Sequence, residues 1–152
     1  MNALVVYFSK FGNTQRVAEA IAGTIGSEGI ASAVSMDEVT VSDLAGSDLV
    51  IMGSPTHRMN LPEAVRPMLK RLPRRALLGT PVAAFDTSYK MSPWLARFTA
   101  AGKLDKRLRK LGGKRVVPCE TFLVVEREGP LYDGEIERAR AWAGSIVKQL
   151  GP

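Results

Sequence analysis

The sequence holds a single cysteine, Cys119, and a single histidine, His57, among its 152 residues. One cysteine cannot form a disulfide within the chain, and these two residues cannot by themselves build a zinc site of cysteine and histidine ligands. Long apolar runs are also missing, because the longest, such as Ala3–Phe8, fall far short of the roughly 20 residues that cross a bilayer. No basic leader precedes the first apolar run, so we do not expect secretion. These absences predict a cytoplasmic protein without disulfides or membrane spans.

Length and composition are those of an ordinary globular chain. Hydrophobic residues make up 45% and charged residues 24%, a balance that excludes wholesale disorder. A chain of 152 residues matches the usual size of one domain and can bury a sizeable core without disulfides or metals. We therefore expect residues 1–152 to form a single domain.

The net charge of +6 is concentrated in one segment. Between Arg97 and Arg115, eight basic residues stand against one acidic residue, Asp105, so this segment carries +7 and the rest is close to neutral. The segment could bind nucleic acid, steer an acidic protein, or simply form a helix face in contact with water. No aromatic residue for base stacking lies between Lys103 and Arg115, so we do not expect nucleic acid as the partner.

Short apolar runs alternate with helical periodicities along the chain. The most continuous runs predict strands buried on both faces, and a more polar run over residues 30–36 predicts a strand near the sheet edge. A last strand over residues 115–125 should be at an edge or split at Pro118, since proline cannot donate to a strand ladder. The buried strands are expected at 3–8, 49–52 and 81–85, and the helices at about 14–26, 41–47, 61–72, 94–111 and 133–150, with Gly102 as a point where the fourth could break.

This alternation predicts an α/β fold, with a parallel sheet covered by helices on both faces. In open sheets of this type, ligands bind beyond the carboxyl ends of the strands, where the strand order reverses. The loops after the first, third and fourth of these strands are therefore the places where function is expected.

The loop after the first strand reads Ser9-Lys10-Phe11-Gly12-Asn13-Thr14 and opens a helix. Backbone N–H groups at a helix N-terminus bind anions, and the hydroxyls of Ser9 and Thr14 add donors. The loop has neither the spacing of a P-loop nor that of a dinucleotide-binding glycine motif. A helix cap without any ligand is the alternative, because serine, asparagine and threonine are favoured caps.

The loops after the third and fourth strands are also polar. Their hydroxyl and backbone donors could bind the edge of a flat ligand, and Tyr89 could cover its face. His57 is the one histidine that could transfer a proton, although packing or hydrogen bonding is the commoner role of a lone histidine. Trp94 could line the same pocket, but its position favours a buried helix residue, and we expect Cys119 and Trp142 in the core.

Taken in order and at these strand ends, the three loops resemble those of the flavodoxin-like family over nearly the whole chain. Residues 9–14 resemble its phosphate loop, residues 54–56 its first isoalloxazine loop, and residues 86–89 its second, where a tyrosine stacks on the flavin. The resemblance implies a three-layer α/β/α fold around a doubly wound, five-stranded parallel sheet in the order 2-1-3-4-5, in its short-chain form. It implies that FMN binds at Ser9, Lys10, Phe11, Gly12, Asn13, Thr14, Ser54, Pro55, Thr56, His57, Arg58, Met59, Asn60, Asp86, Thr87, Ser88 and Tyr89.

Two features differ from typical members of the family. His57-Arg58-Met59 stands where many flavodoxins have an aromatic residue and then glycine, and the net charge is basic rather than strongly acidic. The favoured expectation is an electron carrier that works through FMN, with an acidic redox partner because Arg58 and Lys90 lie on the flavin loops. A proline-threonine pair followed by basic residues is also similar to flavodoxin-fold quinone reductases, so an FMN-dependent NAD(P)H:quinone-type oxidoreductase is the alternative. A binding module without flavin is the second alternative.

Overall fold

Three apolar strands form the centre of the sheet in the computed structural model, which describes residues 1–57, 59–96 and 99–151. These strands are β1 (Asn2–Tyr7), β3 (Leu49–Pro55) and β4 (Pro81–Ser88), and most of their residues are buried because helices cover both sides. The more polar β2 (Ile30–Ser35) lies at the edge, as its composition predicts. All pairs are parallel, and the order β2-β1-β3-β4-β5 confirms the expected topology.

The fifth strand of the sheet is split in two, as Pro118 predicts. Its pieces are β5 (Lys114–Arg115) and β6 (Glu120–Leu123), and both pair with β4. Proline has no N–H to donate, so the ladder stops before residue 118 and resumes after it. The second piece runs along the carboxyl-terminal half of β4, with Phe85 opposite Glu120.

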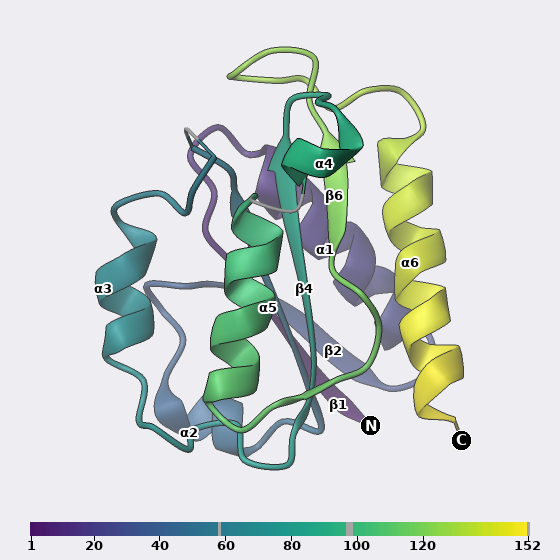
Figure 1. Ribbon diagram of the computed structural model, residues 1–152. Helices are drawn as coiled ribbons and strands as arrows, with labels where there is room; N and C mark the ends of the chain where they lie inside the picture. Colours follow the sequence, from purple (N-terminus) through teal and green to yellow (C-terminus); the bar gives the residue numbers. More distant parts are fainter. Residues whose placement is uncertain (58, 97–98, 152) are drawn as a thin grey trace.

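Helices cover the sheet in two layers (Figure 1). Helices α1 (Asn13–Gly26) and α6 (Glu135–Leu150) pack on one face, where Phe85, Phe122 and Trp142 meet edge to face with ring centroids 6.0–6.1 Å apart. The other face is covered by α2 (Val41–Ala45), α3 (Val65–Lys70) and α5 (Ala100–Lys110), which bury a second cluster of leucine, valine and methionine side chains. Trp142 is thus a core residue, as expected. Within the described residues, no helix has both the length and the apolar character of a membrane span.

The segment expected as one helix over residues 94–111 differs from the prediction. It forms α4 (Pro93–Ala96) and α5, and the predicted break at Gly102 is wrong because this glycine lies inside α5. The burial of Ala101 and Leu104 on the sheet outweighs the cost of about 1 kcal/mol for glycine in a helix. The expected burial of Trp94 is also wrong, since its side chain is 61% exposed. Helix α4 lies near the end of β4 and not over the core (Figure 1), which explains this exposure.

Candidate functional site

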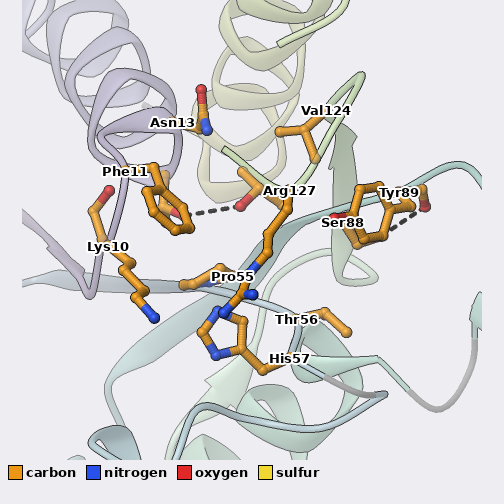
Figure 2. Close-up of a pocket in the computed structure, with 13 residues that line it drawn as sticks. Lys10, Phe11, Asn13, Pro55, Thr56, His57, Ser88, Tyr89, Val124 and Arg127 are labelled. Carbon is orange, nitrogen blue, oxygen red and sulfur yellow. Dashed lines mark hydrogen bonds between the residues drawn. The ribbon is translucent and has the colours of Figure 1, made fainter. Parts of the chain in front are cut away.

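One pocket lies at the carboxyl end of the sheet, where the segments after β1, β3, β4 and β6 meet. Most of the sequence-predicted binding residues line it, although they come from distant parts of the chain (Figure 2). The described residues that line it are Ser9, Lys10, Phe11, Asn13, Thr14, Pro55, Thr56, His57, Thr87, Ser88, Tyr89, Val124 and Arg127.

The loop after β1 turns sharply into α1 at Gly12. This residue has a φ of 92°, in the left-handed region that glycine adopts without strain. The Ser9 hydroxyl accepts hydrogen bonds from the N–H groups of Gly12, at 3.0 Å, and Gln15, at 3.3 Å. These two hydrogen bonds tie the loop to the start of α1, whose N-terminus is the positive end of the helix dipole.

Two of the predicted binding residues, Ser54 and Asp86, are completely buried and do not line the pocket. The Asp86 carboxylate accepts hydrogen bonds from the Thr56 hydroxyl, at 2.6 Å, and from the Ala101 N–H, at 3.1 Å. The Ala100 N–H in turn donates to the Thr56 hydroxyl at 2.9 Å. Asp86 therefore positions Thr56, which lines the pocket, against the first turn of α5.

Burial also changes the acidity of Asp86. Removal of the carboxylate from water raises its pKa above the usual 3.8, although hydrogen bonds from Thr121, Thr56, Ala101 and Thr99 act in the opposite direction. In the folded protein this group thus holds its proton to higher pH than an exposed aspartate does.

Two aromatic side chains flank the pocket. Phe11 is 39% exposed and Tyr89 is 47% exposed, which leaves both rings accessible to a ligand. Figure 2 shows them on opposite sides, with the Arg127 side chain reaching between them toward His57. The Lys10 ammonium lies 5.5 Å from the centre of the Phe11 ring, in cation–π contact.

The charges that line the pocket are all positive. Lys10 and Arg127 are cationic, His57 can become so, and the described lining residues include no aspartate or glutamate. Together with the N-terminus of α1, these side chains make the pocket suited to an anion.

The loop after β3 is held by a short backbone pairing. His57 and Asn60 exchange two N–H···O hydrogen bonds of 2.8 Å, and Met59 between them has a φ of 62°. Lys103 of α5 donates to the Met59 carbonyl at 3.0 Å and to Asn60 Oδ1 at 2.9 Å. Met59 and Asn60 thus face α5 rather than line the pocket, while Arg58 lies outside the described residues.

Sequence reasoning missed Val124 and Arg127, which follow β6. The segment that carries them is tied to the first loop, because Asn13 Nδ2 donates to the Glu128 carbonyl at 3.1 Å. Glycine is favoured at residue 129 because its φ is 103°, and a β-carbon there would also lie 2.6 Å from Asn13 Oδ1. This segment could have been predicted, because it follows the carboxyl end of the fifth strand. In a parallel sheet that end lies at the same edge as the other three loops.

Comparisons with known proteins agree with this architecture. The family model for flavodoxins matches residues 5–142. The chain belongs to the flavodoxin family. Membership of this family implies a flavin cofactor, typically FMN.

Solved structures share the fold at low sequence identity. A flavodoxin from the domain Archaea is 21% identical with a TM-score of 0.80, and the match covers 100% of each chain. Oxidised flavodoxin 1 from Bacillus cereus is 21% identical with a TM-score of 0.80, over 97% of this chain and 98% of that one. A flavodoxin, WrbA-like protein from Agrobacterium tumefaciens is 20% identical with a TM-score of 0.74, over 95% of this chain and 94% of that one.

Proposed function

We propose that this flavodoxin binds FMN in the pocket and carries electrons between redox partner proteins. The observation that carries the proposal is the convergence of the N-terminus of α1, two accessible aromatic rings and cationic side chains in one pocket. A dianionic phosphate suits the helix end, and the exposed rings of Phe11 and Tyr89 offer faces on which a flat aromatic ring system can stack. The residues present therefore fit FMN.

Each part of the pocket has its own task in this proposal. The N–H groups and hydroxyls of residues 9–14 bind the phosphate, Tyr89 stacks on the isoalloxazine, and the segment at Thr56 and His57 contacts its polar edge. Asp86 acts indirectly, by holding Thr56 in place. The remaining predicted contacts, which include Ser54, Arg58, Met59 and Asn60, stay predictions.

When bound, FMN supplies the redox chemistry, and the protein supplies binding, orientation and electrostatics. Lys10 and Arg127 place positive charge at the pocket, which favours the reduced, more negative cofactor. Phe11 and Tyr89 limit the access of water to its faces. This arrangement needs no catalytic side chain, as an electron carrier requires none.

An FMN-dependent NAD(P)H:quinone-type oxidoreductase is the second candidate. His57 in the pocket could transfer a proton to a second substrate. The chain also shares its fold with a WrbA-like protein. Family membership disfavours a module that binds a ligand without flavin, because it implies a flavin cofactor. The expected cytoplasmic location stays a prediction from the sequence.

Purification of the protein with added FMN tests the proposal. We expect a yellow protein that releases FMN on denaturation and exchanges electrons with redox proteins, with negligible NAD(P)H-dependent reduction of soluble quinones. Rapid turnover of both substrates would instead support the oxidoreductase. Failure to retain FMN would contradict both flavin-based functions.

A further inference from the structure

Positive charge extends well beyond residues 97–115 along the layer of α3 and α5. Residues 61–115 hold 14 of the 21 lysine and arginine residues but only 3 of the 15 aspartate and glutamate residues. This stretch carries +11, and the remaining chain, with 7 basic and 12 acidic residues, carries −5. The molecule is therefore polarised much more strongly than its net charge suggests.

The few acidic residues of this stretch do little to offset the charge at the surface. Asp86 is completely buried and Asp105 is 4% exposed, which leaves Glu63 as the exposed acid. Asp105 also forms ion pairs with Arg109, at 3.1 Å, and Arg115, at 3.6 Å. The single carboxylate offsets one of these two positive charges, and the cations of α5 without an ion pair lie elsewhere on the helix.

The free cations of α5 form one stripe, with Lys103 at its start. Lys106, Arg107 and Lys110 follow at intervals of three, four and seven residues, which is the spacing of one helix face. The described residues include no carboxylate that pairs with this stripe. The side chains of Lys103, Lys106 and Lys110 are thus exposed to solvent along α5, and Arg107 lies partly buried beside them.

Helix α3 widens the stripe into a surface. The Arg107 guanidinium donates to the Leu69 carbonyl of α3 at 3.3 Å, so the two helices lie side by side, as Figure 1 also shows. Arg66 and Lys70 are exposed on α3, one turn apart. The basic face, as defined here, consists of Arg66, Lys70, Lys103, Lys106, Arg107 and Lys110.

The basic face begins at the rim of the pocket. Lys103 bonds to Met59 and Asn60 in the loop whose first residue, His57, lines the pocket. A macromolecule that covers the basic face would therefore also reach the pocket opening.

We propose that the basic face docks an acidic electron-transfer protein, with its redox centre brought to the pocket opening. The inference rests on the proposed electron-carrier function. Complementary charge raises association rates by about 10- to 1,000-fold and orients the partner before contact. An acidic protein fits this surface because the unpaired cations adjoin the site where electrons leave or enter.

Two other anionic partners fit the basic face less well. Residues 61–84 and 99–121 contain no aromatic residue on which exposed bases could stack, which disfavours single-stranded nucleic acid. For a membrane surface, apolar side chains should flank the cations, but Leu78 is the sole large hydrophobic residue described as exposed in these ranges.

A binding experiment with matched charge reversals tests the proposal. Isotope-labelled, FMN-loaded protein is titrated with an acidic two-iron ferredoxin and with a basic c-type cytochrome, and amide chemical shifts are followed by NMR. The test variant is Lys106→Glu with Lys110→Glu on α5. The matched control is Arg140→Glu with Lys148→Glu on α6, which reverses the same number of exposed charges on the opposite layer.

We expect the ferredoxin to shift amides of α3, α5 and residues 57–60, and to bind about tenfold more weakly to the test variant. The same loss is expected when salt rises from about 20 mM to about 200 mM, because salt screens exposed charges. The control variant should bind within about twofold of the wild type.

Several outcomes would overturn the inference. These are absence of ferredoxin binding, tighter binding of the cytochrome, shifts confined to α1 and α6, or an equal loss in the control variant. Tighter binding of a DNA duplex or of phosphatidylserine vesicles would assign the face to nucleic acid or membrane. The same titration with the flavin-free protein tests docking independently of the proposed function. Its amide chemical shifts report partner binding even if FMN does not bind.

Discussion

The hydroxyl oxygens of Thr14 and Thr87 lie 2.8 Å apart in a buried hydrogen bond between the first turn of α1 and the end of β4. The two residues are separated by 73 positions in the sequence. Their contact joins the proposed phosphate loop to the strand that leads into Tyr89. It therefore fixes the distance between the two ends of the proposed FMN site.

Replacement of Thr14 with Glu should abolish FMN binding, because it adds negative charge and bulk beside the phosphate. Affinity is measured by quenching of FMN fluorescence, and Thr24→Glu, in the last turns of the same helix, is the control. Unchanged affinity in Thr14→Glu would refute the assignment of the phosphate site.

Ser9→Asp tests the same site without disturbing the buried Thr14–Thr87 contact. An aspartate carboxylate can accept the same hydrogen bonds from the Gly12 and Gln15 N–H groups, so the fold should be retained, which circular dichroism can verify. Repulsion between the new carboxylate and the phosphate should weaken FMN binding by at least about tenfold. An affinity equal to that of the wild type would show that the phosphate binds elsewhere.

Tyr89→Ala should weaken FMN binding by about 3- to 10-fold and reduce the quenching of flavin fluorescence, because a stacked ring contributes about 0.5–1.5 kcal/mol beyond burial. Tyr132→Ala is a suitable control, since Tyr132 is similarly exposed, at 42%, and does not line the pocket. If both variants behave like the wild type, Phe11 becomes the candidate for stacking.

Arg127→Gln should weaken FMN binding by about tenfold, because it removes a cation that lines the pocket. The equivalent change on α6, Arg140→Gln, removes one exposed positive charge that does not line the pocket and should leave the affinity unchanged. Isothermal titration calorimetry measures both. Tighter binding by Arg127→Gln would mean that this side chain obstructs the flavin rather than attracts it.

Asp86→Asn should change the pH dependence of stability. The pKa of Asp86 is raised by burial, so the folded state holds the proton more tightly than the unfolded state. The free energy of unfolding of the wild type should therefore fall as pH rises from about 3.8, the ordinary pKa, through the raised pKa of the folded state. The free energy of unfolding of Asp86→Asn, compared with that of the wild type, should therefore increase over this pH range. At higher pH the difference between the two proteins should stay constant.

Urea unfolding across a pH series measures this difference. Asp48→Asn, which removes an exposed carboxylate, is the control. A stability difference between Asp86→Asn and the wild type that stays constant with pH would contradict the assigned direction of the pKa shift.

The sequence carried enough information for the sheet because its signals are local. Continuous apolar runs predict β1, β3 and β4, and a single proline predicts the split between β5 and β6. The loop at residues 9–14 was also predictable, since cap residues and a turn glycine precede a clear helical periodicity.

Contacts between distant residues set the rest of the site, and a single sequence does not display them. Thr56 and Asp86 are 30 positions apart, and Asn13 and Glu128 are 115 apart. The resemblance of residues 86–89 to a flavin-binding loop implied a binding role for Asp86, yet this residue is completely buried and supports Thr56. Arg127 escaped notice for the same reason, because only the folded chain brings its segment over the loop after β1.

A titration of the flavin-free protein with FMN and, separately, with riboflavin tests the central claim most directly. The two ligands share the isoalloxazine and differ in the phosphate, which the account assigns to the N-terminus of α1. We predict saturation at one FMN per chain with strong fluorescence quenching, and affinity for riboflavin at least about 100-fold lower, since hydrogen bonds to a charged group contribute about 1.5–3 kcal/mol each. Equal affinities for the two ligands, or no binding of FMN, would contradict the account.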